Sequence, residues 1–427
     1  MGNPVGTVTH GPQSAAGGLL PIDTALSIIL ERATPLGCEQ VASADADGRY
    51  LAAAATAVID LPPFTSSAMD GYAVRAVDTP HTLSVVGESA AGRPFTCTVG
   101  PGEAVMISTG AALPDGADAV VPIEQVTQSG ERSVGGTQAA RNTPASITVP
   151  TVLAGAAVRP RASDTSAGAT IVDAGTRVTP GQLGALLAAG VATVRCGRRP
   201  SVAVLTTGDE LRPPGVKLAP GEIYDSNGPM VAAATRRAGA VPVRVPAAAD
   251  TPAAHRAALA DALAHDVVVT TGGVSVGAHD LVRGIGAELG VHELFWRIRM
   301  RPGKPLSFGV RDATLVFGLP GNPVSALVCF ELFVAPALAG LQGARSPRPA
   351  FIPARLAQTV RRNPERDDLI RVTRRDDGTL EPARGQQSHQ IAITALADGV
   401  ARIPAGTGEL AAGAEVAYLP LTGGVAS

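Results

Sequence analysis

Apolar runs followed by glycine-rich turns recur between residues 200 and 343. The run Val267–Val269 leads into the turn TTGGVSVGAHD, and the same order is found in VAVLTTGDEL (Val202–Leu211) and TLVFGLPGNPVSALVCF (Thr314–Phe330). Such runs are typical of strands buried on both faces, and the glycines allow tight turns that present backbone N–H groups to an anion. Because parallel strands end at one edge of an open α/β sheet, the three turns predict one ligand site.

Helices are expected between these strands. Asn227 is followed by Pro229 and Thr251 by Pro252, which is the pattern of a helix cap with proline in the first turn. Strands that alternate with short capped helices predict a parallel sheet covered on both faces. We therefore expect an α/β domain over residues 199–344.

The rest of the chain has other patterns. Pro21–Pro35 predicts an amphipathic helix capped by Asp23 or Thr24, and Thr179–Val194 predicts a helix and a strand. Short alternating runs rich in Gly, Pro, Val and Thr predict a β-rich domain from about residue 60, in which the polar stretch 127–150 would be an exposed hairpin or loop. Similar short runs after residue 344 predict a small C-terminal β-domain, and residues 1–18 a disordered tail.

Composition narrows the class of protein. With 17% charged residues and a net charge of −2, the chain has no basic excess for nucleic acid or a membrane surface. Its four cysteines are far apart and form no CxxC motif, which fits a reduced, cytoplasmic setting. The apolar stretch 324–341 contains Glu331 and Pro336, so we expect a core or interface helix there and no membrane span.

Acidic residues lie beside the predicted turns. They are Asp209, Glu210, Asp225, Asp250 and Asp280. One acid at a strand end is often a helix cap, whereas several acids beside a phosphate-binding turn suit Mg²⁺, which takes oxygen ligands and bridges to phosphate. The sequence leaves both interpretations open.

A cationic segment follows in FWRIRMRPGKPLSFG. On a strand, alternation would place Arg297, Arg299 and Arg301 on one face and Ile298 and Met300 on the other. Pro302 and Gly303 then end the strand and bring Lys304 into a turn. A solvated strand is the alternative, but arginines that converge on a turn favour a phosphate or similar oxyanion. The seven histidines are scattered and Ser275 lacks a GxSxG context, so electrostatic and metal-assisted chemistry is expected.

Seven motifs follow one another along the chain. They are PPFTSSAMDGYAVRAVD, ISTGAALPDGADAVVPIE, TTGDEL, GEIYDSNG, TTGGVSVGAHDLV, RPGKPLSFG and GLPGNPVSAL. Together, and in this order, they resemble the molybdopterin molybdenumtransferase family, which comprises the bacterial MoeA proteins, the E domain of gephyrin and their plant counterpart. The resemblance implies a multidomain α/β homodimer. Its regions would be an N-terminal helical and β linker or dimer domain (19–59 plus 157–198), a β-rich lid-like domain (60–156), a MogA-like α/β molybdopterin-binding domain (199–344) and a small C-terminal β-barrel-like domain (345–427).

The implied reaction is the final step of molybdenum cofactor biosynthesis. Molybdate would be inserted into adenylylated molybdopterin with Mg²⁺-dependent release of AMP, and molybdopterin adenylyltransferase is a candidate partner. Two alternatives remain within the resemblance, namely a molybdopterin-binding carrier or scaffold paralogue without insertion activity and a tungstate-selective insertase. The related adenylyltransferase itself is a short single-domain protein, so the additional domains argue against that activity.

The resemblance also assigns residues. Asp280 and Asp250 would serve Mg²⁺, with Glu210 a further acid needed for activity, and Gly272, Gly273 and Ser275 would line the phosphate turn. The oxyanion pocket would take Arg297, Arg301, Lys304 and Ser325, with Arg371 and Ser388 from the C-terminal domain. Asp70, Thr109 and Asp164 would reach the site across the dimer, although Asp70 beside Gly71 is also a common turn pair.

Three departures from the family pattern affect this site. Arg297 and Arg301 stand where lysine is usual, and a planar guanidinium binds an oxyanion differently from a compact ammonium. His279 is unusual in its turn, and Gln387 replaces a usual glycine in the C-terminal domain. These changes motivate the tungstate and carrier alternatives.

Overall fold

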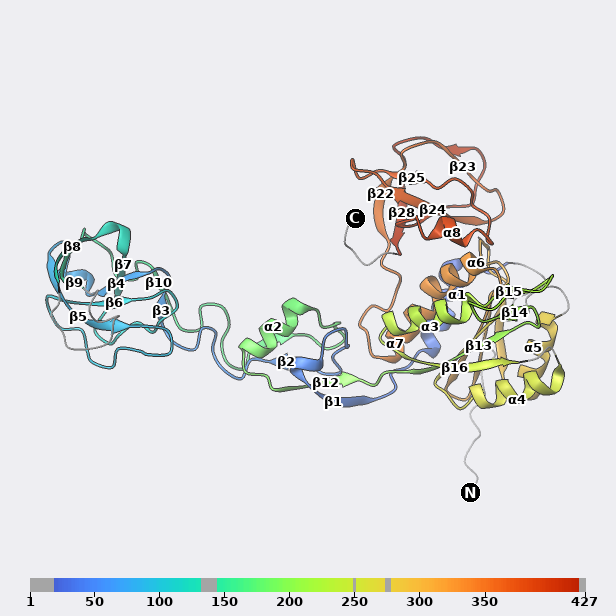
Figure 1. Cartoon of the computed structure of the whole chain (residues 1–427), viewed down its shortest axis with the longest axis horizontal. Helices are drawn as coiled ribbons and strands as arrows, with labels where there is room; N and C mark the ends of the chain where they lie inside the picture. Colours follow the sequence, from blue (N-terminus) through green and yellow to red (C-terminus); the bar gives the residue numbers. More distant parts are fainter. Residues whose placement is uncertain (1–18, 132–143, 249–250, 273–277, 422–427) are drawn as a thin grey trace, which may run out of the picture.

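The chain forms an elongated molecule with distinct domains at its two ends (Figure 1). The computed structural model describes residues 19–131, 144–248, 251–272 and 278–421. The β-rich domain lies at one end, the α/β and C-terminal domains lie at the other, and a slender middle region that carries α2 (Pro180–Ala188) connects them.

A six-stranded sheet forms the centre of the α/β domain. Its order is β16 (Val241–Ala248), β13 (Ser201–Thr207), β17 (Val267–Thr271), β21 (Thr314–Leu319), β20 (Ser307–Arg311) and β18 (His292–Trp296). The first four strands are parallel, as the sequence predicts, whereas β20 and β18 join antiparallel. Thr270 pairs with both Leu205 and Gly318, so the three predicted turns leave the sheet at one edge.

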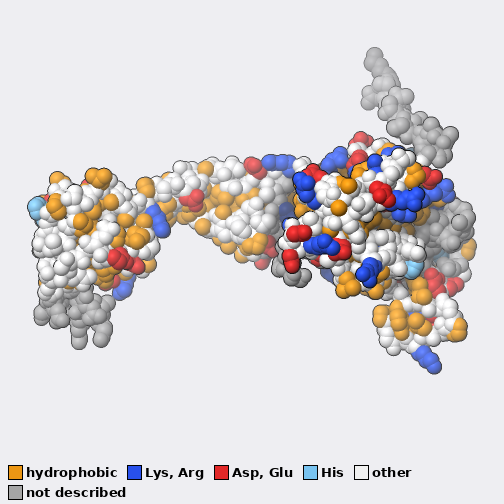
Figure 2. Space-filling model, turned by 90° about the horizontal axis from the view of Figure 1, so that it is seen from above, with side chains coloured by type: hydrophobic (Ala, Val, Ile, Leu, Met, Phe, Trp, Pro, Cys, Tyr) orange, Lys and Arg blue, Asp and Glu red, His pale blue; other side chains and the backbone are white. Residues whose placement is uncertain are grey.

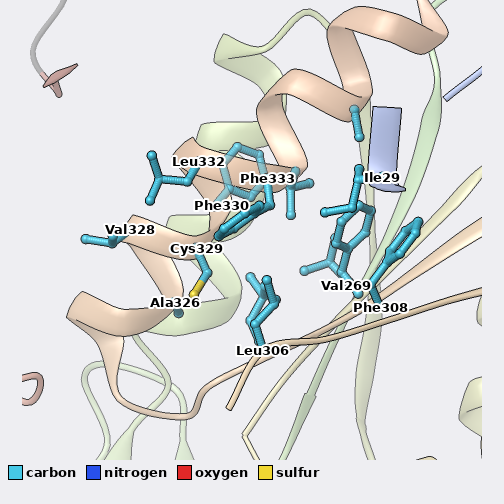
Figure 3. Close-up of a cluster of buried hydrophobic side chains, with 14 of the residues drawn as sticks. Ile29, Val269, Leu306, Phe308, Ala326, Val328, Cys329, Phe330, Leu332 and Phe333 are labelled. Atoms are coloured by element: carbon cyan, nitrogen blue, oxygen red, sulfur yellow. The ribbon is translucent and has the colours of Figure 1, made fainter. Parts of the chain in front are cut away.

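Helices cover both faces of this sheet. One face carries α1 (Ile22–Arg32), α3 (Asn227–Arg237), α6 (Pro323–Cys329), a π-helical segment (Phe330–Val334) and α7 (Ala335–Leu341); the other carries α4 (Pro252–Ala262) and α5 (Ala278–Glu288). Consecutive residues of β17 point to opposite faces of the sheet. Val269 belongs to the hydrophobic core on the α1 face, and Val268 belongs with Leu259 to the core on the α4 and α5 face. Figure 3 shows Ile29 of α1 near Val269 and Phe308 of the sheet. A short pair, β14 (Leu211–Arg212) and β15 (Ile223–Tyr224), lies beside the sheet.

Helix α1 differs from its prediction in two ways. The sequence assigns it to the N-terminal region, but its buried residues pack in the α/β core. The predicted cap at Asp23 or Thr24 is wrong, because the helix begins after Pro21 without a side-chain cap. The Asp23 carboxylate instead accepts hydrogen bonds from Arg402 of the C-terminal domain at 3.2 and 3.0 Å.

The apolar helix from Pro323 to Leu341 is a core helix. By length and composition it could cross a membrane, but 78% of the apolar stretch is buried inside the protein. The expectation of a core helix is confirmed.

The β-rich domain is built on a second six-stranded sheet. Its order is β7 (Ala119–Pro122), β4 (Gly71–Val74), β6 (Glu103–Ile107), β5 (Thr82–Ser89), β9 (Pro144–Thr148) and β8 (Thr127–Glu131), and β3 (Ser66–Ser67) pairs with β10 (Val158–Arg159) outside it. Short 3₁₀ turns occur at Ala76–Asp78 and Ile123–Gln125. Strands β8 and β9 are antiparallel, which confirms a hairpin in the polar stretch 127–150. The expected exposure is wrong for part of it, because Ile147 and Val149 are buried in the core of this domain.

The middle region combines segments from before and after the β-rich domain. Strand β1 (Cys38–Ala42) pairs with β12 (Thr193–Gly197), and β2 (Ala55–Thr56) pairs with β11 (Thr170–Val172). A 3₁₀ turn occurs at Ser43–Asp45, and α2 begins with a capping box formed by Thr179 and Gln182. This pairing is why two separate stretches of sequence make one region.

The C-terminal domain is a β-sheet that also takes a strand from the α/β domain. Its order is β19 (Met300–Arg301), β24 (Asp367–Arg374), β26 (Gly399–Ile403), β28 (Glu415–Pro420) and β22 (Ile352–Arg355), with β25 (Leu380–Pro382) beside β24. Strand β23 (Val360–Arg361) pairs with β27 (Glu409–Leu410), and α8 (Ile391–Thr394) is a single turn. The cationic segment therefore joins the two domains through β19.

Candidate active site

The turn after β17 approaches the end of β13 closely. Gly272 has φ +96°, and a Cβ on it would lie 2.4 Å from the Thr207 carbonyl oxygen. Only glycine fits this position without displacing the backbone. Three other residues predicted for the site, Gly273, Ser275 and Asp250, lie outside the described residues, and Asp280 is described only as a backbone position in the first turn of α5.

Asn227 connects two of the turns, a role that the sequence did not reveal. Its Nδ2 donates to Thr271 Oγ1 at 2.9 Å and to the Gly321 carbonyl oxygen at 2.7 Å. The predicted capping role is wrong, because the helix begins after Ser226 and the Asp225 carboxylate accepts the Gly228 N–H at 2.9 Å. A side chain with two amide donors is the residue type that can join two turns.

The acids beside the turns have different roles. Asp225 is committed to structure, because its carboxylate also pairs with Arg244 at 2.8 Å. Glu210 is exposed in the turn after β13. Among the described residues, no group of three or more His, Cys, Asp or Glu side chains is placed to hold a metal.

Two buried oxygen atoms at this edge have no hydrogen-bond partner within the described part of the chain. They are Oγ1 of Thr207, at the end of β13, and Oδ1 of Asn227, at the start of α3. Buried polar atoms normally have partners. A hydroxyl and an amide oxygen are groups that a phosphate, its water or a hard cation can use, so the residues present fit a phosphorylated ligand with Mg²⁺.

The cationic segment keeps the predicted alternation. Ile298 and Met300 are buried, whereas Arg297, Arg299 and Arg301 are exposed. It is not one regular strand, because Arg297 has φ +73° between β18 and β19. Lys304, in the turn that follows, is exposed. Figure 2 shows Lys and Arg side chains gathered over the end of the molecule formed by the α/β and C-terminal domains.

Arg301 is bound to the C-terminal domain. Its Nη2 donates to Oδ2 of Asp368 at 2.6 Å, and the Asp368 side chain is only 5% exposed. Burial raises the pKa of Asp368, and the neighbouring Arg301 opposes that rise. The pair fixes β19 against β24 and holds one cation at the junction of the domains.

Arg371 organises the loop that carries Ser388. The Arg371 side chain is buried and donates to the carbonyl oxygens of Gln390, Gly385 and Gln387 at 2.6, 2.9 and 3.1 Å. A fourth bond reaches Thr394 Oγ1 at 3.2 Å. The guanidinium is thus used in holding the backbone of loop 385–390, which also fixes the position of Gln387.

Loop 385–390 rests on the turn that precedes α6. Asn322 Nδ2 donates to Ser388 Oγ at 2.9 Å, and the Val324 N–H donates to the Ser388 carbonyl oxygen at 3.1 Å. Ser325 is buried in the first turn of α6. Ser388 and Ser325, predicted for one pocket, are therefore brought to the same place by contacts between two domains.

A cavity of about 390 Å³ lies between α5 and the sheet. Its lining includes Thr270, Ser307 and Gly318 from the strands and Gly286 from α5. This volume lies within the range of small-molecule sites.

Asp70 and Thr109 form a pair at the far end of the molecule. The N–H and Oγ1 of Thr109 donate to Asp70 Oδ1 at 2.6 and 3.0 Å, and these hydrogen bonds lower the pKa of Asp70. Both residues are exposed in the β-rich domain, at the opposite end from the α/β turns (Figure 1). Asp164 is exposed near the junction with the middle region. One chain alone does not bring these three residues to the other predicted site residues.

Three family models match the chain in order. They describe the MoeA N-terminal region, domains I and II (residues 20–190), a probable molybdopterin binding domain (203–340) and the MoeA C-terminal region, domain IV (353–421). The chain is 38% identical to molybdopterin molybdenumtransferase 2 of Mycobacterium tuberculosis, over 88% of this chain and 93% of that protein. The chain belongs to the molybdopterin molybdenumtransferase family.

Further members of the family agree with this assignment. The molybdopterin molybdenumtransferase of Nostoc sp. is 34% identical over 88% of this chain and 87% of that protein. The crystal structure of the molybdopterin biosynthesis moeA protein from Pyrococcus horikoshii has a TM-score of 0.77 at 26% identity, over 94% of this chain and all of that one. The predicted multidomain α/β fold, with its β-rich, α/β and C-terminal β-domains, is confirmed.

Proposed function

We propose that this chain is a molybdopterin molybdenumtransferase, which inserts molybdate into adenylylated molybdopterin and releases AMP as the final step of molybdenum cofactor biosynthesis. One observation carries the proposal beyond family membership. Asn227 joins the turns after β17 and β21, and Gly272 lies against Thr207 at the end of β13. Asn322 joins the C-terminal loop to the turn before α6, and Arg301 fixes the cationic segment to the C-terminal domain. An anionic, phosphorylated substrate and an oxyanion both need such turns and cations.

The substrate's charged groups would have different partners. The turn at Gly272 would bind phosphate through backbone N–H groups. Arg297, Arg301, Lys304 and the two serines, Ser325 and Ser388, would bind molybdate, with Arg371 acting through the loop backbone that it holds. The cavity beneath α5, with its volume of about 390 Å³, would take the pterin ring system.

Magnesium would be held by Asp250 and Asp280, with Glu210 nearby. When bound, Mg²⁺ supplies positive charge to the phosphate oxygens at the bond that breaks. The protein's own backbone N–H groups and cationic side chains would orient the phosphates, because preorganised donors stabilise the charge that develops at a phosphoryl centre.

A homodimer would complete the site. Asp70, Thr109 and Asp164 would reach the α/β turns of a second copy. The middle region supports this proposal, because Val58, Ile59 and Leu187 are 63%, 41% and 48% exposed there. Apolar side chains exposed together are typical of interaction surfaces. We expect a cytoplasmic enzyme, with molybdopterin adenylyltransferase as the candidate supplier of its substrate.

A carrier or scaffold that binds molybdopterin without inserting metal is the second candidate. The arginines at 297 and 301 and Gln387 favour it, as does the engagement of Arg301 with Asp368. The same residues motivate a preference for tungstate, because an arginine pocket offers planar, paired donors.

The test is AMP release by purified protein supplied with adenylylated molybdopterin, Mg²⁺ and a titration of molybdate or tungstate. We expect release that depends on one oxyanion, and binding without release would establish the carrier. Asp280→Asn should abolish release while the fold is retained, as judged by circular dichroism. Asp47→Asn, which changes an exposed acid outside the site, is the matched control and should retain full turnover. Full turnover by Asp280→Asn would overturn the site assignment.

A further inference from the structure

Trp296, the single tryptophan of the chain, contacts two arginines. The guanidinium carbon of Arg297 is 3.7 Å from the centroid of a Trp296 ring, and that of Arg283 is 4.2 Å away. Both distances are within the range of a cation–π contact, for which tryptophan is the strongest partner. Arg283 belongs to α5, so the indole connects the helix that follows the phosphate turn with the cationic segment.

The two arginines are bound differently. Arg283 is paired with Glu293 of β18 through two hydrogen bonds of 2.5 and 2.6 Å. Arg297 has no carboxylate partner in the described part of the chain, although its neighbour Arg301 is paired with Asp368. Of the two arginines that contact Trp296, Arg297 is thus the one whose donors are left for a ligand.

The backbone around Arg297 is fixed. Strand β18 ends at Trp296, and Arg297 has φ +73°, which non-glycine residues seldom adopt. Its N–H donates to the Leu306 carbonyl oxygen at 3.0 Å, and its own carbonyl oxygen accepts the Leu20 N–H at 3.2 Å. Unusual backbone conformations persist where the surrounding structure determines them, and they cluster at functional sites.

Stacking determines where the arginine's donors point. A guanidinium that lies over an aromatic face keeps its N–H groups in its own plane, where they can bind an oxyanion in pairs. A lysine ammonium gains less direction from the same ring, because it is a point charge on a flexible stem. Arg297 and Trp296 are therefore a matched pair in this chain.

We propose that Trp296 is a positioning residue that aligns Arg297 for the oxyanion and couples this alignment to α5 through Arg283. The inference rests on the proposed function for the identity of the oxyanion. Trp296 acts through Arg297 and need not touch the substrate.

The first test is kinetic and uses Trp296→Leu and Trp296→Phe. Loss of the aromatic face in Trp296→Leu should raise the half-saturating molybdate concentration about 3- to 10-fold, as expected for a cation–π contact at a partly exposed site, with a smaller change in the maximal rate of AMP release. Trp296→Phe keeps an aromatic ring and should restore most of the affinity. A double-mutant cycle with Arg297→Lys should be non-additive, because the second substitution loses little once the ring is gone. Additive effects would overturn the proposal.

The second test needs no adenylylated substrate. Trp296 is the only source of tryptophan fluorescence, so molybdate added to the wild-type full chain should change its emission, while chloride at matched ionic strength should not. Arg297→Ala should remove the response. If saturating molybdate leaves the Trp296 fluorescence emission unchanged, the proposal is overturned. A response that depends on Arg297 in a protein that releases no AMP would refute the proposed activity and leave the positioning role intact.

Discussion

At the scale of single residues, Gly272 begins the turn after β17, for which we propose phosphate binding. Because its φ is +96° and a Cβ would meet the Thr207 carbonyl oxygen at 2.4 Å, Gly272→Ala should displace the turn. We expect a loss of about 1–3 kcal/mol in the free energy of unfolding and a much larger loss of AMP release. Chemical denaturation and the release assay measure the two effects separately.

Gly184 is the matched control for that substitution. It lies within α2, and a Cβ there would meet nothing within 4 Å. Gly184→Ala should leave turnover unchanged and stabilise the protein by up to about 1 kcal/mol, because alanine favours the helix. Equal stability and turnover in both variants would show that the turn tolerates a side chain.

Site residues that depend on a local sequence pattern could be predicted, whereas those that depend on contacts with distant residues could not. Gly272 and the alternation around Ile298 and Met300 follow from local pattern, since a tight turn and a half-buried strand leave a sequence signature. The contacts made by Asn227 and by Asp368 leave none, because their partners are distant along the chain: Gly321 for the first and Arg301 for the second. Residue type signals the capacity for hydrogen bonds, whereas the fold selects the partner.

Asp266 joins the start of β17 to the segment that leads from the middle region into β13. Its carboxylate, just before β17, accepts bonds from Arg198 at 3.1 and 2.6 Å and from the N–H and Oγ of Ser201 at 2.7 and 2.8 Å. Burial alone would raise the pKa of Asp266, but these hydrogen bonds outweigh it and lower the pKa below its ordinary value of 3.8. The interaction holds the link from the middle region against the sheet.

The lowered pKa sets the sign of a pH dependence. A carboxyl group with a lowered pKa in the folded state stabilises the protein above its ordinary pKa, and this contribution is lost as the pH falls through the folded value. Asp266→Asn should therefore cost about 1–3 kcal/mol at pH 7, and its difference from the wild type should shrink below pH 3.8. Urea denaturation at several pH values measures this, with Asp47→Asn as an exposed control. A difference that does not change with pH would contradict the assigned ion pair.

The elements themselves were partly predictable. The central parallel strands and the helix starting at Pro252 follow the sequence pattern, because periodicity and capping report burial and chain direction. The antiparallel edge strands, the packing of α1 on the α/β core and the pairing of β19 with β24 do not follow from it. Periodicity indicates that a face is buried, but it does not identify what covers that face.

The extended shape of the whole molecule separates residues that the family resemblance assigns to one site. Asp70 and Thr109 lie in the β-rich domain, and α5, which carries Asp280, lies at the other end (Figure 1). A single elongated chain cannot close that separation without bending its middle region. A symmetric dimer would let the β-rich domain of each chain serve the α/β domain of the other.

Mixed dimers test this arrangement. A chain with Asp70→Asn and a chain with Asp280→Asn should each be inactive alone, and a heterodimer of the two should contain one intact site. With random pairing, about half of the dimers are heterodimers and about one quarter of the wild-type activity should return. A mixture of Asp70→Asn with Thr109→Ala is the control, because both substitutions lie in the β-rich domain and every site would keep a defect. If the first mixture stays inactive although mass spectrometry detects heterodimers, Asp70 does not act across the dimer.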